Sequence, residues 1–443
     1  EEVTPPRIKA LLIDQAENAR LSRRLATIQL DSPIPFDPAT YHLKPPHQDQ
    51  LIDLLRELGF TTLLKSFQPA AKPADTNAVG TEVIQDEPSA QRFVEGLPKG
   101  GVLGLQCLLS PGPGAQADVE GIALSTGDKT AFIPLDVHAY MRPIIALLHD
   151  STRTKVVHDL KSTLLAFHRI GVTLAGPYLD TMVADYLLNP NRRNHQLETI
   201  AMEVLDHRLG TGHKDSAAPK SLFDEDTGSR EEAAEASSVL ARLAPVLTER
   251  LSEQGSLALF TDVEMPLVPV LAEIERNGFL LDVEGLHRLS KELERDLDKI
   301  METIAVAAGG EFNINSPKQL ATVLFEKLGL KPIRKTKTGY STDEDTLTQL
   351  ATQHELPAQI VNYRSLSKLK STYVDALPEL VNPETKRLHT SLNQTVAATG
   401  RLSSTEPNLQ NIPVKGEYGL RIREAFIAPP GHTLLCADYS QIE

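Results

Sequence analysis

Cysteine is scarce in this sequence and occurs only twice in 443 residues. Two cysteines cannot form the several bridges that hold a small secreted domain together, so that class of protein is excluded. Cys107 and Cys436 both lie in apolar runs. We therefore expect each of them to be a small buried hydrophobic residue in a reducing compartment.

Long apolar runs are missing as well. The sequence contains no uninterrupted apolar stretch of about 18 residues, the length that a membrane-spanning helix requires. It also has no signal-peptide pattern, and it begins with Glu1-Glu2 rather than methionine. We therefore expect no membrane span, and we expect that the front end has been cut or processed.

Positive charge is in deficit over the whole chain, whose net charge is −14. Such a balance argues against a nucleic-acid-binding protein. The charge is unevenly distributed, however. Residues 355–424 contain nine lysines and arginines against seven aspartates and glutamates, a local charge of +2, which leaves −16 for the remainder. A basic face in this part of the chain could still neutralise phosphates.

The length of the chain is sufficient for two or three domains. Residues 1–68 are predicted to be helical, with helices within 11–28 and 48–60, and residues 69–87 are predicted to be a linker because proline and glycine replace large apolar residues there. Residues 88–257 predict an α/β domain with a mixed sheet, since strands come first and helices and strands then alternate.

The expected elements of this middle domain follow from apolar periodicity. Strands are expected at 102–109, 119–125, 130–135 and 155–158, with a hairpin turn at Thr126-Gly127-Asp128. Helices are expected at 140–149, 160–167, 180–188 and 197–205. The polar stretch 211–235 is expected to be a mobile loop.

Residues 258–385 predict a group of helices. Asp282 is the expected N-cap of a long helix that ends at Gly309-Gly310, with an apolar stripe at residues 286, 289, 293, 297, 300 and 304. Ser316-Pro317 is expected to start a second helix, and Ser341 with Glu344 to form a capping box. The basic loop 331–337 is either a solvated surface or a contact with duplex phosphates.

The helix expected at 358–377 has two different faces. At 100° per residue, Leu366, Leu369 and Tyr373 share one face, and Arg364, Lys368 and Ser371 share the opposite one. Two cations and a hydroxyl in a line are typical either of a solvated surface or of a contact with a nucleic-acid backbone. The residues alone do not decide between these alternatives.

The last part of the chain, residues 386–443, ends in an apolar run. Residues 433–437 are predicted to be a buried strand that places Asp438 at its end. Burying a carboxylate is costly unless it is paired or binds a metal. Asp438 is therefore a candidate ligand of a divalent cation, with an ion pair to Arg421 or Arg423 as the alternative.

Two motifs in this region, TGRLSSTEPNLQNIP from Thr399 and DYSQIE from Asp438, resemble the polymerase domain of bacterial family A DNA polymerases. The resemblance implies a DNA-templated DNA polymerase of replication and repair, with a helical thumb at 258–385 and the start of a palm at 386–443. It implies two Mg²⁺ ions, primer–template DNA and deoxynucleoside triphosphates as partners, and a monomer in the cytoplasm that associates with the nucleoid.

The resemblance also implies roles for particular residues. Asp438 would be one of two catalytic aspartates, and the backbone carbonyl of Tyr439 would be a further metal ligand. Gln441 and Glu443 would contact the nucleotide. The residues implied in DNA binding are Arg364, Lys368, Lys370, Thr372, Arg401, Asn408, Gln410 and Asn411. An Arg401–Glu406 pair and simple turn chemistry at Asn408 are the alternatives.

Residues 88–257 are similar to the RNase H-like 3′–5′ exonuclease domain of the same family, but the metal ligands differ. The family positions for carboxylates and a tyrosine fall here on Gln106, Leu108, Thr163, Glu232 and Ala236. Most of these side chains offer no anionic oxygen to a divalent cation. We therefore expect an inactive scaffold, with the nearby Asp159 and Asp180 acting as a helix cap and a surface charge.

Residues 1–68 resemble the tail of the family's 5′-nuclease domain, without the acidic cluster of that nuclease. The family also carries a nucleotide-binding helix and a second aspartate beyond the position of Glu443, which this sequence does not include. We therefore expect a polymerase piece that does not extend a primer alone. A duplex-binding module without catalysis and a residual nuclease are the alternatives.

Overall fold

A computed structural model describes residues 13–29, 47–58, 60, 63, 80–109, 119–135, 141–210, 227–336, 339–414 and 416–440. The chain divides into two units, residues 1–70 and residues 71–443. The first unit contains α2 (Ala16–Ala26) and α3 (Gln48–Glu57), both within the ranges that the sequence predicted to be helical. α2 buries none of its residues.

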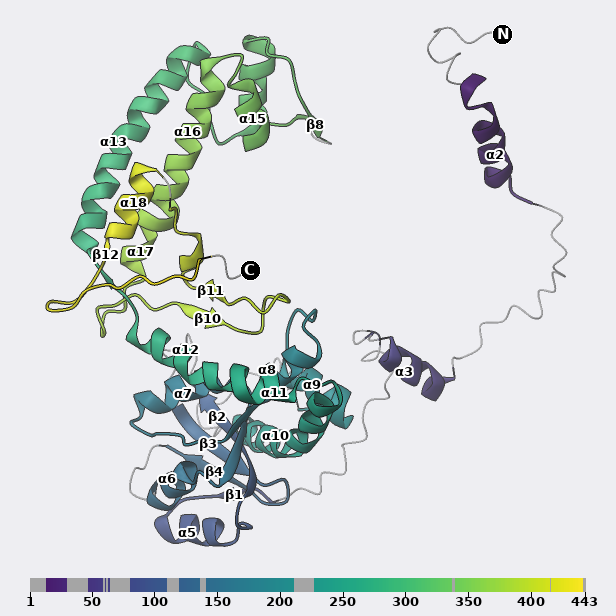
Figure 1. The fold of residues 1–443 in the computed structure, drawn as a ribbon, viewed down its shortest axis with the longest axis vertical. Helices are drawn as coiled ribbons and strands as arrows, with labels where there is room; N and C mark the ends of the chain where they lie inside the picture. The colour runs from purple at the N-terminus through teal and green to yellow at the C-terminus, as the bar shows by residue number, and fades with distance from the viewer. Residues whose placement is uncertain are drawn as a thin grey trace. The chain divides into compact units, whose positions relative to one another are not determined.

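A six-stranded mixed sheet forms the centre of residues 82–253, as Figure 1 shows. The strands lie in the order β1-β4-β3-β2-β5-β6. The pairs β1–β4, β2–β5 and β5–β6 are parallel, and β3 is antiparallel to both of its neighbours. The strand bounds are β1 (Glu82–Val83), β2 (Gly101–Leu109), β3 (Val119–Ser125), β4 (Thr130–Pro134), β5 (Arg153–Val157) and β6 (Tyr178–Asp180).

The four predicted strands and the mixed sheet are confirmed, and two strands were missed. β1 lies within the segment expected to be a linker, where Glu82 and Val83 pair with Ala131 and Phe132 of β4. β6 has only three residues, too few for an apolar period to show.

Six helices accompany this sheet among the described residues. They are α5 (Glu87–Glu95), α6 (Met141–His149), α7 (Leu160–Arg169), α8 (Thr181–Leu188), α9 (Leu197–Leu205) and α10 (Thr227–Glu253). α10 packs across β2, β3 and β4. It approaches β2 so closely that a Cβ on Gly104 would stand 2.0 Å from the carbonyl oxygen of Ser237, which explains the glycine.

The prediction of a loop at 211–235 is wrong for its last nine residues. Residues 227–235 form the first turns of α10, because Ala233 and Ala234 are buried, and Ala233 packs against Phe132 of the sheet. A polar composition concealed a helix that is held by tertiary packing. Residues 211–226 lie outside the described residues.

A helical connection leads from α10 to a pair of long helices. It comprises α11 (Leu257–Leu259), the π-helix η3 (Phe260–Glu264), α12 (Met265–Asn277) and β7 (Leu280–Leu281). α13 (Val283–Ala308) follows and has the predicted ends, with the Asp282 carboxylate accepting a hydrogen bond from the Gly285 N–H and with Gly309 in the left-handed conformation. Five of the six predicted stripe positions are fully buried, and Ile300 is partly buried.

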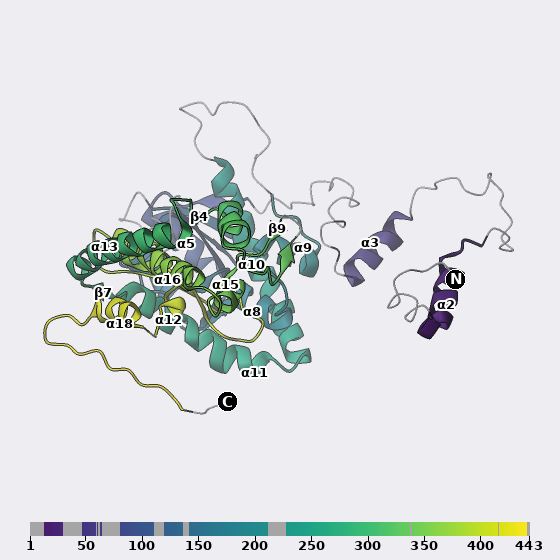
Figure 2. The same cartoon turned by 90° about the horizontal axis from the view of Figure 1, so that it is seen from above.

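The second long helix, α16 (Glu355–Leu369), lies beside α13, as Figures 1 and 2 show. It continues through the π-helix η5 (Lys370–Val374) into α17 (Ala376–Glu379). Between the long helices lie α14 (Pro317–Ala321), the π-helix η4 (Thr322–Lys327), β8 (Lys335–Thr336), β9 (Gly339–Tyr340) and α15 (Glu344–Leu350). Ser316 caps α14 as predicted.

The capping box expected at Ser341 and Glu344 is wrong. The N-cap of α15 is Asp343, whose carboxylate accepts a hydrogen bond from the N–H of Thr346, and the Ser341 hydroxyl accepts one from the N–H of Asp343. Asp343 is a stronger acceptor for the free N–H groups of the first turn, so the helix begins two residues later than predicted.

The C-terminal part contains β10 (Ser391–Asn393), β11 (Ser403–Thr405), the 3₁₀-helix η6 (Leu409–Asn411), α18 (Glu417–Glu424) and β12 (Phe426–Ile427). β10 and β11 are antiparallel, and β12 pairs with β7. The buried strand expected at 433–437 is wrong, as is the buried Cys436. Leu435 is 91% exposed and Cys436 is exposed, because no described strand pairs with this segment. None of the helices described is long and apolar enough to cross a membrane.

Candidate nucleic-acid interface

One face of α16 and η5 opens on a cavity of about 580 Å³. Arg364, Lys368 and Thr372 line it at intervals of four residues, and Asn411 lines it from η6. Leu366, Leu369 and Tyr373 pack against the apolar core that contains Leu286 and Leu289 of α13, and Leu369 and Tyr373 also line the cavity. Arg364 and Lys368 border the cavity together, whereas Ser371, which was predicted to share their face, is not among its lining residues.

The cations of this face differ in their surroundings. Nη1 of Arg364 donates a hydrogen bond of 2.7 Å to the carbonyl of Thr342, and partial burial lowers the pKa of its guanidinium. Lys368 is exposed. Nζ of Lys370 lies 2.8 Å from the Asp375 carboxylate, so a neighbouring charge offsets its own. Arg364 and Lys368 thus carry the positive charge of the cavity wall, to which Glu344 adds one negative charge.

A short hairpin carries Arg401. β10 and β11 pair over residues 391–393 and 403–405, and the chain between them turns through Gly400, whose φ of +78° favours glycine. Arg401 is exposed directly after this glycine. Its side chain therefore lies at the surface of a connection whose two ends are fixed by the strand pair.

The three predicted amides lie in and beside η6. The Asn408 side chain accepts a hydrogen bond from the N–H of Gln410 and caps the 3₁₀-helix. The Gln410 amide donates to the carbonyl of Leu402 and accepts from the N–H of Ser404, which holds η6 against β11. Only Asn411 of the three borders the cavity.

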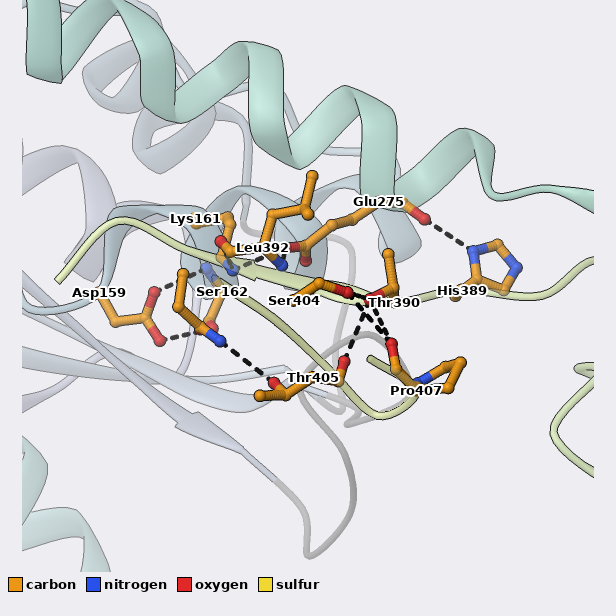
Figure 3. Close-up of polar contacts among 11 residues, drawn as sticks. Asp159, Lys161, Ser162, Glu275, His389, Thr390, Leu392, Ser404, Thr405 and Pro407 are labelled. Carbon is orange, nitrogen blue, oxygen red and sulfur yellow. Dashed lines mark hydrogen bonds and ion pairs between the residues drawn. The ribbon is translucent and has the colours of Figure 1, made fainter. Parts of the chain in front are cut away.

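Hydroxyl groups that the sequence did not single out hold the same turn together. Thr390 Oγ1 lies 2.8 Å from Ser404 Oγ and also donates to the carbonyl of Pro407, and Ser404 Oγ accepts from the N–H of Leu409, as Figure 3 shows in part. Threonine and serine are common in every chain, so nothing in the sequence marks this pair. Its role follows only from the contact.

Asp438 and Tyr439 lie in an extended, exposed segment, and the Tyr439 side chain is 84% exposed. Arg421, offered as an alternative partner of Asp438, donates instead to Glu292 of α13 at 2.6 Å. Among the described residues, no three His, Cys, Asp or Glu side chains gather around a possible metal position. These residues therefore do not form a metal site by themselves. Gln441 and Glu443 lie outside the described residues.

A second cavity, of about 470 Å³, lies beside the six-stranded sheet. Four of the five positions where the sequence departs from the exonuclease pattern line it together: Gln106 and Leu108 of β2 and Glu232 and Ala236 of α10. Glu198 and His158 also line it, and the sequence reasoning missed both of them. Thr163 is not among the lining residues; it is buried, and its hydroxyl donates to the carbonyl of Asp159.

The two aspartates next to this region both cap helices. Asp159 caps α7 by accepting a hydrogen bond from the N–H of Ser162, as predicted. The expectation that Asp180 is a surface charge is wrong, since Asp180 is 1% exposed and accepts from the N–H groups of Asp159, Leu160 and Met182. Burial, aided by the Asp159 carboxylate, raises the pKa of Asp180 to about 7.

Comparison with known proteins assigns two regions of the chain. Residues 283–443 match the family model of DNA polymerase family A. Residues 115–211 match the model of the DNA polymerase I ribonuclease H-like domain. The first region contains both long helices and the candidate interface, and the second contains most of the six-stranded sheet.

Several curated proteins are similar over nearly the whole chain. DNA polymerase I of Pseudomonas aeruginosa is 38% identical over 470 residues, covering 98% of this chain and 51% of that protein. DNA polymerase I of Bacillus subtilis is 33% identical over 464 residues, covering 100% of this chain and 50% of that protein. The chain thus spans about half the length of these relatives.

A solved structure is similar in fold. It is the POL domain of Pol1 from M. smegmatis in complex with DNA primer-template and dNTP, with a TM-score of 0.70 and 30% sequence identity over 79% of this chain and 59% of that one. By sequence and by fold, residues 283–443 of the chain belong to DNA polymerase family A, and residues 115–211 ahead of them match the RNase H-like domain of DNA polymerase I.

Proposed function

We propose that this chain binds the primer end of a primer–template duplex and serves templated DNA synthesis, the transfer of deoxynucleotides to a primer 3′-hydroxyl. The observation that carries the proposal is the cavity shared by Arg364, Lys368, Thr372 and Asn411. Cations spaced one helical turn apart on a packed helix suit consecutive phosphates, which fix the position of a duplex without reading its sequence. Contact with DNA would also bring the protein to the nucleoid.

In our proposal, each part of the chain has its own role. Residues 1–68 correspond to the tail of a 5′-nuclease domain, followed by a linker that ends before β1, since β1 belongs to the six-stranded sheet. Residues 88–257 form the RNase H-like scaffold, residues 258–385 the thumb and residues 386–443 the start of the palm. Arg401 reaches the minor groove at the primer end, where purine N3 and pyrimidine O2 accept hydrogen bonds on every correct pair. Asn408, Gln410, Lys370 and Thr372 complete the polar contact.

Family A polymerases use two metal ions, and Mg²⁺ is our proposed metal. Asp438 and the carbonyl of Tyr439 would supply ligands, and Gln441 and Glu443 would contact the deoxynucleoside triphosphate. A two-metal site needs carboxylates on both sides of the metal pair. Because the described residues gather no such group, these roles require ligands in addition to Asp438.

The lack of a metal-ligand group among the described residues favours a second candidate for the 443 residues taken alone, a duplex-binding module without catalysis. A nuclease function is disfavoured, since Gln106, Leu108 and Ala236 bring no carboxylate to the cavity beside the sheet and its two glutamates, Glu198 and Glu232, are not part of a group of three possible metal ligands among the described residues.

Primer–template binding and primer extension separate these candidates. The 443-residue chain should bind a recessed primer end and should not extend it, whereas the chain with its natural downstream sequence should extend it. Asp438→Ala in that longer chain should lower the extension rate by about a hundredfold or more, because a bound metal supplies several kcal/mol of transition-state stabilisation. Undiminished extension by Asp438→Ala, or absence of DNA binding by both chains, would refute the proposal.

A further inference from the structure

A buried ion pair holds both backbone groups of Leu392 in β10. The carboxylate of Glu275, in α12, is 3% exposed as a residue and accepts from Nζ of Lys161 at 2.6 Å and from the N–H of Leu392 at 2.5 Å. Nζ of Lys161, in α7, also donates to the carbonyl of Leu392 at 2.8 Å. Figure 3 shows the three residues side by side. The lysine comes from the RNase H-like region and the leucine from the hairpin that carries Arg401.

Three further contacts hold the chain on either side of Leu392. Nδ1 of His389 donates to the carbonyl of Glu275 at 2.7 Å. The Gln394 amide donates to the carboxylate of Glu264 at 2.8 Å. The hydroxyl of Tyr186, from α8, donates to the carbonyl of Ala397 at 2.7 Å. Residues 389–397 are thus held by α12 and by two side chains of the RNase H-like region.

The ring of Tyr186 is held in place by its own neighbours. It is 3% exposed, and its ring meets the His195 ring edge-on with 5.7 Å between the centroids. Nδ1 of His195 lies 2.6 Å from the carboxylate of Asp185. A hydroxyl on a ring that cannot turn away positions its acceptor more precisely than an exposed tyrosine would.

The form of these contacts indicates a positioning role. A buried ion pair stabilises a protein little more than apolar residues of the same volume, and its best documented use is to fix one register. Here Nζ of Lys161 donates to the C=O of Leu392 and the Glu275 carboxylate accepts from its N–H, so a shift of β10 by one residue would remove both hydrogen bonds. A shift by one residue would turn every side chain of the strand to the opposite face.

We propose that Lys161 and Tyr186 are positioning residues through which the RNase H-like region holds residues 389–397 and thereby sets Arg401 against the terminal base pair of a primer–template duplex. The region would therefore serve as a support for the primer-end hairpin, although the residues of its own cavity are not those of a nuclease. This inference rests on the proposed function in so far as it names the duplex end.

Tyr186→Phe and Lys161→Met, made in the full 443-residue chain, test the inference. Tyr186→Phe removes one hydroxyl and keeps the ring. Lys161→Arg is the conservative variant, which should retain the hydrogen bonds that Lys161→Met removes. Tyr178→Phe is the matched control, because the Tyr178 hydroxyl donates to the carbonyl of Leu174 within the RNase H-like region. Lys129→Met is the second control, since Nζ of Lys129 donates to the carbonyl of Gly96.

Two measurements apply to every variant. Amide hydrogen exchange over residues 389–401 should become about fivefold faster in Tyr186→Phe, the factor that one ordinary hydrogen bond represents, and at least as much faster in Lys161→Met, which also leaves the buried Glu275 carboxylate unpaired; it should not change in the controls or in Lys161→Arg. The preference for a matched over a mismatched primer end, measured as a ratio of Kd values, should fall by a similar factor of about five. The slope of log Kd against log salt should stay constant, since these variants leave the proposed phosphate contacts in place.

The outcomes separate the inference from the proposed function. Unchanged exchange over 389–401 in Tyr186→Phe and Lys161→Met, or equal changes in the controls, would overturn the inference. A lower melting temperature with an unchanged preference for a matched primer end would show that Lys161 and Tyr186 only stabilise the fold, and this result would also overturn the inference. If the wild-type chain binds no primer–template DNA, the proposed function fails, and the exchange measurement still decides whether the RNase H-like region holds the hairpin.

Discussion

The hydroxyl of Tyr373 donates a hydrogen bond of 2.5 Å to the backbone carbonyl of Asn411. Tyr373 lies in η5, at the end of the helix that carries Arg364 and Lys368, and Asn411 lies in η6. The bond therefore joins the two walls of the cavity that we assign to DNA binding. Because Tyr373 is also part of the core under α13, the geometry of this cavity is tied to the packing of the long helices.

Tyr373→Phe should weaken DNA binding without removing any charge. We expect a loss of stability of about 1 kcal/mol and an increase in Kd for duplex DNA of about fivefold, both being the usual effect of one hydrogen bond. Fluorescence anisotropy with labelled duplex and a denaturant titration measure the two quantities. A Kd equal to that of the wild type would show that the η5–η6 contact does not shape the DNA site.

Arg364→Ala combined with Lys368→Ala should flatten the salt dependence of DNA binding. Each neutralised duplex phosphate contributes about 0.9 to the slope of log K against log salt, so the double variant should lose about 1.8. Kd values at four or five salt concentrations give the slope. Lys129→Ala with Arg242→Ala removes two exposed cations from the six-stranded sheet region and is the matched control. An unchanged slope in the first variant would leave Arg364 and Lys368 as ordinary surface charges.

The chain should not degrade a 3′ end. In the cavity beside the sheet, an amide, a leucine and an alanine occupy positions 106, 108 and 236, and these side chains offer no anionic ligand to Mg²⁺ or Mn²⁺. Single-stranded DNA labelled at its 5′ end and incubated with either cation should therefore keep its length, next to an active 3′–5′ exonuclease as a positive control. Shortening that EDTA abolishes would contradict this expectation.

Asp180 should make stability fall as pH rises from 5 to 7. Its carboxyl, with a pKa raised from 3.8 to about 7, keeps its proton in the folded chain and loses it in the unfolded one across this range. Folding then binds a proton, so each pH unit costs up to about 1.4 kcal/mol through this group. Asp180→Asn cannot ionise, and its stability relative to the wild type should rise by about 2 kcal/mol from pH 5 to pH 7, because the wild-type carboxyl is already half ionised at pH 7.

Denaturant titrations at pH 5, 6 and 7 measure this difference. The variant leaves one backbone N–H without an acceptor, so the two proteins will differ at every pH, and only the change with pH tests the carboxyl. Asp128→Asn, at the exposed hairpin turn between β3 and β4, is the control. Parallel stability profiles of Asp180→Asn and the wild type would contradict the raised pKa.

The sequence predicted elements well where local chemistry decides them. Asp282 and Gly309 bound α13 as expected, because a carboxylate satisfies the free N–H groups of a first turn and glycine accepts the left-handed conformation after a last turn. It failed at the start of α10, where alanines in a polar stretch become buried only against the sheet. It failed again at 433–437, since a strand requires a partner strand as well as an apolar run.

In the candidate site, too, local spacing could be predicted from the sequence and tertiary contacts could not. The common face of Arg364 and Lys368 follows from the period of the α-helix and could be read from the sequence, which however predicted Ser371 rather than Thr372 as the third member. The sequence does not show that Asn411 borders the same cavity, that Lys370 is paired with Asp375 or that Asp180 is buried. These facts depend on which distant segment lies next to each residue.

The sequence by itself determined the apolar stripe of α13 and the two ends of that helix, because each is a property of residue types at short spacing. The missing carboxylates at Gln106, Leu108 and Ala236 follow instead from the resemblance to the exonuclease domain. Only the tertiary structure decided that Lys161, Glu275 and Leu392 meet. They are separated by more than a hundred residues along the chain, and a lysine or a glutamate carries no local mark of its partner. Burial then fixes the pairing, since neither charge can remain uncompensated away from water.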